Sequence, residues 1–159
     1  MAKLAAFERD VVALSEGVWI NPDPRNTDIE LRVKAKDGAF IDVLSATYRE
    51  LVRKAREDGR LKSRQGLNDL PPSAVQSAED DLLLDRLVLD VRNLDGESGP
   101  VTIAEYRAMA RTEQFRPLLD LAREAVAIAT DRRAADREDA LGNFGLSRPT
   151  VSSGAPQPS

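Results

Sequence analysis

The N-terminal third of the chain carries an alternation of apolar and charged residues that is typical of a β-strand. Over Asp28–Lys34 the two kinds alternate, so that Ile29, Leu31 and Val33 face one side. Before it, the β-prone triplet Val18–Ile20 leads into a segment rich in turn-forming residues. We therefore expect a β-hairpin with a long loop. Other elements must cover its apolar face, because an isolated hairpin is only marginally stable in water.

The following part of the chain shows apolar residues at the three- and four-residue spacing of amphipathic helices. We expect four helices. The first follows Gly38 and reaches as far as Gly59, and the second runs from Ser73 or Ser77 to Leu94. The third is short and begins at Thr102, and the fourth runs from the 112–117 segment to the 141–145 segment. In the second of them, Leu87, Val91 and Leu94 continue the apolar stripe at spacings of four and three. Thr102 and Glu105 have the spacing of a capping box.

These elements predict an α+β fold that is mostly α. Residues 1–145 form a single domain, with the β-hairpin at its N-terminus and about four helices after it. Residues 146–159 are rich in Ser, Pro and Gly, so we expect them to form a disordered tail.

The composition disfavours an enzyme. The chain has no His and no Cys, which excludes disulfides, thiol nucleophiles and metal sites built from imidazole or thiolate. The commonest general acid and base near neutral pH is also missing, and no nucleophile-elbow pattern is present. We expect a non-enzymatic protein with no cofactor. It has neither a signal-peptide pattern nor an apolar run of the roughly 18 residues that a membrane span needs, so we expect a cytosolic protein without a membrane partner.

Charge is unevenly distributed along the chain. Residues 65–99 hold two basic and eight acidic side chains, including Glu79, Asp80, Asp81 and Asp85. These four carboxylates are one candidate for a Mg²⁺ or Ca²⁺ site, but the spacing is not that of an EF-hand. Acidic residues near the start of a helix also favour its dipole, and this structural interpretation is the preferred one.

Seven basic residues between Arg49 and Arg64 form the one basic run. Such a run can contact phosphates or an acidic protein surface. No aromatic residue lies within it and no helix-turn-helix pattern is present, which disfavours nucleic acid as a partner. Because the acidic 65–99 segment follows directly, we expect the run to pair with that segment.

Two aromatic residues are the candidate protein-binding residues. Trp19 is the single Trp; such a residue is more often part of a core, although binding anchors are enriched in Trp. Phe144 follows the charged end of the last helix and precedes the tail, where an exposed aromatic ring would suit docking.

Several segments, in this order, resemble the tail assembly chaperones of long-tailed (siphovirus-like) bacteriophages and prophages. The resemblance covers about residues 15 to 144 and is carried by Gly17–Ile20, Asp28–Val33, Leu87–Leu94, the Asp95–Pro100 turn with Val101 and Thr102, the Phe115–Ala129 helix, and Leu141–Asn143. Proteins of that family often have an apolar helix ending in Asp-Trp-x-x-Leu. Here Val91 stands where that Trp often stands.

The resemblance implies a non-catalytic protein of the host bacterial cytoplasm that acts during phage tail morphogenesis. Its implied partners are the tape measure protein and the tail tube protein, and a second copy of the chain is a further candidate. Amphipathic helices suit this task because they offer an apolar face to partner helices. The alternative from another class is a structural virion component of the tail or the head–tail connector, assembled by strand addition.

Overall fold

A small antiparallel sheet and four α-helices make up the part of the chain that the structure describes. The structure is a computed structural model; it describes residues 16–145 and the side chains of residues 16–142. The expected fold class, α+β and mostly α with an N-terminal β-hairpin, is confirmed for these residues. The elements are β1 (Val18–Ile20), β2 (Glu30–Val33), α2 (Gly38–Glu57), the 3₁₀ turn η2 (Leu67–Asp69), α3 (Pro72–Arg86), β3 (Val88–Arg92), β4 (Asp95–Gly96), β5 (Gly99–Pro100), α4 (Ile103–Ala110) and α5 (Arg116–Gly145). The expected disordered tail, 146–159, lies outside the described residues.

The predicted hairpin is confirmed, since β1 pairs antiparallel with β2 with Ile20 opposite Leu31. Ile20, Leu31 and Val33 are all buried, so the alternation in the sequence correctly identifies the inward side. At Gly17, which has a positive φ of 75°, a Cβ atom would stand 2.7 Å from the carbonyl oxygen of Val33. The chain can therefore approach β2 this closely at position 17 only with glycine.

The prediction of one helix from residue 73 to Leu94 is wrong. Helix α3 ends at Arg86, and Val88–Arg92 forms the third strand, so the sheet order is β1-β2-β3. A bulge explains the error: Arg32 lies opposite Asp90, but Val33 lies opposite Val88, so Leu89 has no partner. Val88 and Val91 both face the core although they are three residues apart. In the sequence this spacing imitates a helix.

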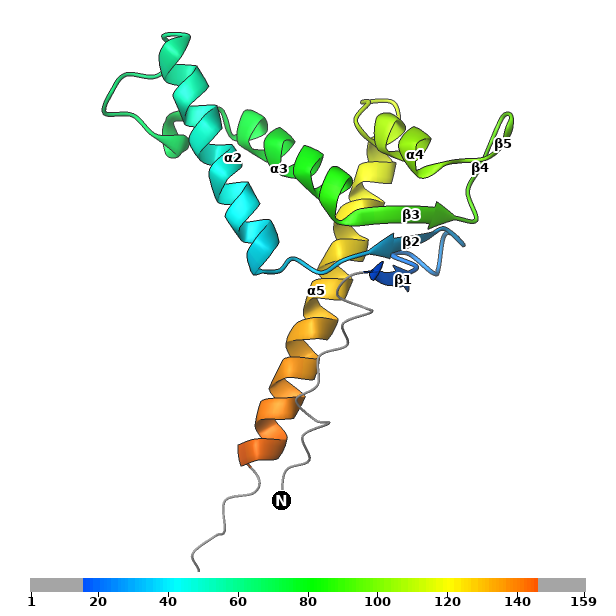
Figure 1. Cartoon of the computed structure of the whole chain (residues 1–159). Helices are drawn as coiled ribbons and strands as arrows, with labels where there is room; N and C mark the ends of the chain where they lie inside the picture. The colour runs from blue at the N-terminus through cyan, green and yellow to red at the C-terminus, as the bar shows by residue number, and fades with distance from the viewer. Residues whose placement is uncertain (1–15, 146–159) are drawn as a thin grey trace, which may run out of the picture.

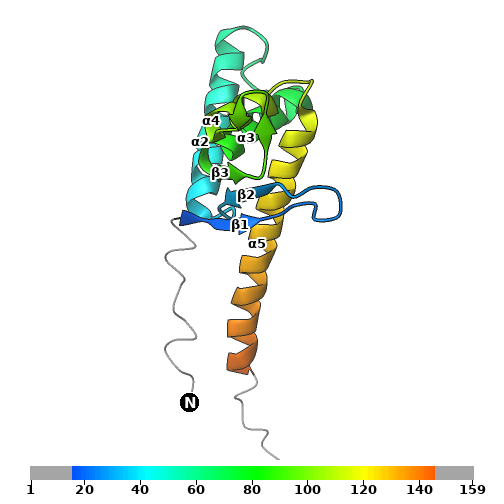
Figure 2. The same cartoon turned by 90° about the vertical axis from the view of Figure 1, so that its right-hand side faces the viewer.

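Helix α5 crosses the sheet and contributes more buried residues to the core than any other described helix. It contacts β1, β2, α3 and α4, and the strands run across its axis (Figures 1 and 2). Its buried residues are Leu119, Ala122, Ala125, Val126 and Ala129. Small residues at this face let the helix approach the sheet closely. From residue 131 to 142 its side chains are mostly exposed, as its charged sequence predicts, and this half projects beyond the other described elements (Figure 1).

Helix α4 is fixed at its start and through its one aromatic residue. The predicted capping box is confirmed: the Thr102 hydroxyl accepts from the Glu105 amide at 3.2 Å, and the Glu105 carboxylate accepts from the Thr102 amide at 3.1 Å. Tyr106 is fully buried, and its hydroxyl donates to the Leu118 carbonyl at 2.5 Å, which ties α4 to α5.

No helix of the described residues combines the length and the apolar character that a membrane crossing requires.

Candidate protein-binding site

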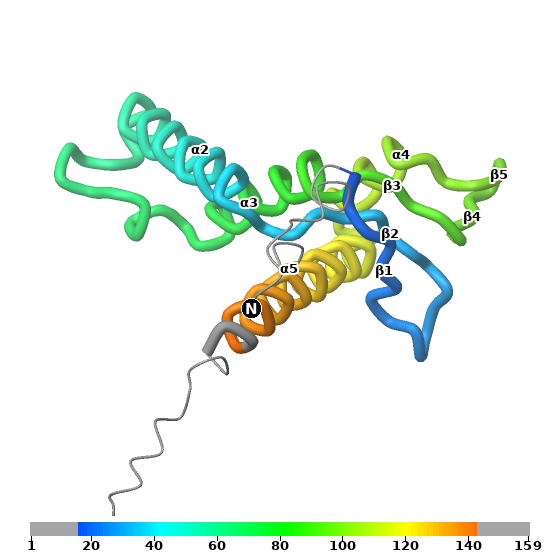
Figure 3. The backbone as a smooth tube through the Cα atoms, turned by 60° about the horizontal axis from the view of Figure 1, so that its bottom comes forward, coloured from blue at the N-terminus to red at the C-terminus, as the bar shows by residue number. Residues whose placement is uncertain are grey.

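Helix α2 lies on one side of α5, and α4 with the β4–β5 hairpin lies on the other (Figure 3). Both ends of α2 are well defined. The Asp37 carboxylate accepts from the Phe40 amide at 2.8 Å at the start, and Gly59 takes a positive φ of 75° just after the end. The Arg60 amide donates back to the Ala55 carbonyl at 2.9 Å, which satisfies one of the last carbonyls of the helix.

The rest of the protein covers α2 lightly. Of its 20 residues only Phe40 and Ala55 are buried, and its packing partners are α3 and η2. Ile41 remains 56% exposed. A small second core holds α2 to the following segment; its members are Ala55, Leu61 and Leu70, with Leu51, Val52, Leu67 and Val75 partly buried against them. We call α2 with residues 58–71 the α2 lobe.

An open groove of about 630 Å³ lies between α2 and the η2 turn. Its apolar lining comes from Tyr48 and Val52 on the helix and from Leu67 on the turn, with Gly66 beside it. Arg49, Arg53, Arg56 and Glu57 complete the lining and are all exposed. We call this the α2 groove. It combines an apolar surface with three guanidinium groups, a chemistry suited to binding a protein segment.

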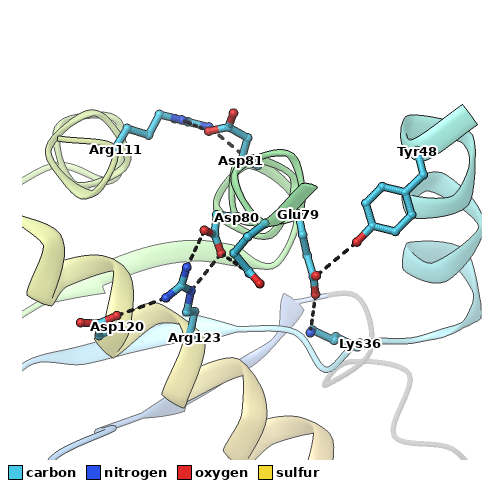
Figure 4. A network of polar contacts seen from close by, with 9 residues as sticks. Lys36, Tyr48, Glu79, Asp80, Asp81, Arg111, Asp120 and Arg123 are labelled. Carbon is cyan, nitrogen blue, oxygen red and sulfur yellow. Dashed lines mark hydrogen bonds and ion pairs between the residues drawn. The ribbon is translucent and has the colours of Figure 1, made fainter. Parts of the chain in front are cut away.

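Glu79 of α3 ties the α2 lobe to the body of the protein (Figure 4). Its carboxylate accepts from the Lys36 ammonium at 3.0 Å and from the Tyr48 hydroxyl at 3.2 Å. Burial, followed by the neighbouring Glu79 carboxylate, raises the pKa of Tyr48 above its ordinary value. The hydroxyl therefore stays protonated at neutral pH and donates to Glu79.

Asp80 is the one buried charged residue of the described part, with 7% of its surface exposed. It accepts two hydrogen bonds from the guanidinium of Arg123 on α5, at 2.9 and 2.5 Å (Figure 4). The hydrogen bond to Asp80 raises the pKa of Arg123, so the guanidinium keeps its charge. It is a bidentate pair, the strongest geometry for a guanidinium and a carboxylate.

The four carboxylates considered as a cation site are each paired with a basic side chain. Glu79 and Asp80 pair as above, and Arg111 bridges Asp81 at 2.9 Å and Asp85 at 2.7 Å. Residues 16–142 contain no group of three or more acidic side chains arranged to hold a metal ion. This acidic cluster joins α3 to α4, α5 and the chain before α2.

These pairs correct the expected role of the basic run. Within the described residues, the carboxylates of the 65–99 segment that form ion pairs take partners from outside the run, namely Lys36, Arg111 and Arg123. Arg53 pairs instead with Glu50 and Glu57 on its own helix, and Arg60 with Asp58. The acidic segment therefore does not neutralise the run, which leaves its charge on the surface of the α2 lobe.

Trp19 lies outside the main core, on the outer face of the sheet. It is half-buried, and the guanidinium of Arg92 stands 4.2 Å from its ring centroid, with that of Arg32 at 6.0 Å. Arg92 is also paired with Glu30. Trp19 thus sits in a charged surface patch, where it stays a candidate contact residue. Phe144 falls within α5, and its side chain lies outside the described residues.

Sequence reasoning missed the α2 groove. The signal for half of it was present, because helical periodicity puts Tyr48 and Val52 on one side of α2 and Arg49 and Arg56 beside them. Leu67 comes from a loop that the pattern could not position.

No family model matches the chain, and comparison with curated proteins and with solved structures likewise found no match.

Proposed function

We propose that this chain is a non-enzymatic protein-binding protein, namely a tail assembly chaperone of a long-tailed bacteriophage or prophage. In this role it binds the tape measure protein in the host bacterial cytoplasm and recruits tail tube subunits to it. The order of sequence segments described above suggests the family.

The observation that carries the proposal is the light cover on α2. A chaperone for a long helical client has to offer an apolar surface without unfolding itself. Ile41, Tyr48 and Val52 are spaced seven and four residues apart, so they follow one side of α2. This side remains partly exposed while Phe40 anchors the helix in the core.

Co-expression of the tagged chain with the tape measure and tail tube proteins of its own gene neighbourhood tests this proposal. We expect the tape measure protein to be soluble only with the chain and to co-purify with it. Ile41→Glu should reduce that retention. Phe115→Glu is the matched control, because Phe115 is also exposed, at 40%, but lies just before the start of α5 and not on α2.

A structural virion component is the second candidate, and one observation favours it. Within the described residues, β1 has a strand partner on one side only, so its other edge is open to strand addition. Purified particles separate the two proposals. If the chain is retained in them and neither protein co-purifies with it from cells, the chaperone proposal is wrong.

A further inference from the structure

The α2 groove has two chemically different sides. Its apolar side is formed by Tyr48, Val52 and Leu67, which are all partly buried. Its cationic side is formed by Arg49, Arg53 and Arg56, at spacings of four and three along α2. This spacing keeps the three guanidinium groups on adjacent positions of one helical side.

The cations of the groove are only partly engaged within the protein. Glu50 and Glu57 hold Arg53, and Arg56 donates one hydrogen bond to the Gln65 carbonyl at 2.8 Å. Arg49 forms no ion pair within residues 16–142. A guanidinium has five N–H donors, so Arg49 and Arg56 retain donors for a carboxylate.

The charge around the groove is also predominantly positive. Residues 49–64 contain seven Lys or Arg and three Asp or Glu, and all seven basic side chains are exposed. Of the acidic residues that follow in the sequence, four pair elsewhere, with Lys36, Arg111 and Arg123. Asp69 of the η2 turn accepts a hydrogen bond from the Gly66 amide, and counting it leaves an excess of three basic side chains around the groove. An approaching partner therefore meets an excess of positive charge next to an apolar surface.

We infer that the α2 groove binds an acidic amphipathic helix of a partner protein. Leucine-like side chains of that helix occupy the apolar side, and its carboxylates pair with Arg49 and Arg56. The inference rests on the proposed function, because it specifies which kind of client segment this site takes. A nucleic acid fits less well, because a phosphate backbone gains nothing from Val52 and Leu67, which line the same groove.

Fluorescence anisotropy with two labelled peptides tests this inference on the full chain. Both peptides have about four helical turns with Leu at helical spacing, one with Glu and one with Lys at the remaining positions. We expect the Glu peptide to bind and the Lys peptide not to bind. Binding should weaken at least about tenfold when salt is raised from about 50 mM to about 300 mM, because screening shortens the range of the attraction.

Two matched variants locate the binding. Arg49→Glu reverses an exposed charge in the groove and should weaken binding of the Glu peptide about tenfold. Arg132→Glu reverses an exposed charge on α5 and should leave it unchanged. Circular dichroism checks that both variants keep the helix content of the parent chain.

Each outcome bears on one of the two proposals. Absence of Glu-peptide binding, equal binding by the two variants, or displacement of the peptide by a single-stranded oligonucleotide would overturn the inference, even if the tape measure protein co-purifies. Formation of a dimer that blocks the peptide would show that a second copy occupies the groove and would overturn it too. If the peptide binds as expected but the tape measure protein is not retained, the proposed function fails and the groove assignment stands.

Discussion

The α2 lobe and the body of the protein are built in different ways. In the body, the sheet, α3, α4 and the first half of α5 share one core, in which Leu31, Val33, Leu84, Tyr106 and Val126 are fully buried. The α2 lobe has a core of three buried residues. Polar contacts to Glu79 supplement the packing of α2 on α3. The body has the packing that specifies a fold, whereas the lobe keeps apolar and cationic surface available.

This difference separates stability from binding. A residue of the body is surrounded on all sides, so changing it affects the folded state as a whole. A residue of the lobe contacts few neighbours, so changing it should act locally and on the partner that we propose for the lobe. Paired substitutions, one in each region, can break or sharpen this comparison.

The largest difference is expected between two leucines. Leu84→Ala empties a position that is 0% exposed in the main core, so it should lower the free energy of unfolding by about 2–5 kcal/mol. Leu61→Ala removes the same atoms from the small core of the lobe, where the surroundings collapse more easily, and should cost about 1–2 kcal/mol. Urea denaturation measures both values. Equal costs would show that the lobe is packed as tightly as the body.

Two helix caps give the next contrast. Asp37→Ala and Thr102→Ala each remove a capping side chain, from α2 and α4 respectively, and each should cost about 1 kcal/mol. Native-state hydrogen exchange distinguishes the two. For Asp37→Ala we expect the loss of protection to be concentrated in α2, and for Thr102→Ala to extend over the body. If Asp37→Ala also lowers protection evenly across the sheet, α2 unfolds only together with the body.

How far the sequence predicts the fold depends on whether an element depends on local pattern or on a distant partner. The hairpin, the Gly59 cap that follows α2 and the Thr102 capping box depend on residues close together in the chain, and these predictions are confirmed. Strand β3 depends on pairing with β2, which lies about 60 residues earlier, and on the bulge opposite Val33. The local periodicity shows neither the pairing with β2 nor the bulge, so the pattern of Val88–Arg92 predicts a helix.

The candidate site was less predictable than the fold. Trp19 attracts attention as the single Trp, yet the sequence does not show that Arg92 is adjacent to it across the sheet. The basic run is visible in the sequence, but its expected pairing with the acidic segment is wrong, because Arg111 and Arg123 form the ion pairs with that segment. Charge totals give the sign of a surface and not the partners of its side chains.

The two tyrosines sharpen the comparison through pH. Burial raises the pKa of Tyr106 well above its ordinary value of 10.0. The protonated Tyr106 hydroxyl therefore contributes fully to the stability of the folded state below pH 10. It is lost as the pH rises through the higher pKa of the folded state. Tyr106→Phe should cost about 1 kcal/mol near neutral pH by removing the bond to the Leu118 carbonyl, and should weaken the alkaline loss of stability.

Tyr48→Phe is the control in the lobe, because the pKa of Tyr48 is also raised but its hydroxyl bonds to the partly exposed Glu79. Urea denaturation at several pH values follows both variants. We expect a smaller cost for Tyr48→Phe than for Tyr106→Phe. A larger cost would mean that the polar link to Glu79 holds the protein together more strongly than the contact between α4 and α5.

The smallest expected effect concerns the outer face of the sheet, which belongs to the body but is charged like the lobe. Arg92→Ala removes the guanidinium stacked on Trp19 and its pair with Glu30, both partly exposed, so it should cost about 0.5 kcal/mol. Acrylamide should quench the fluorescence of the single Trp more strongly in this variant, and Arg132→Ala should leave the quenching unchanged. Unchanged quenching in Arg92→Ala would mean that Arg92 does not shield the ring. Trp19 quenching in the parent chain also shows where a partner protein binds. A partner bound in the α2 groove should leave the quenching unchanged, whereas a partner bound to the outer face of the sheet should lower it.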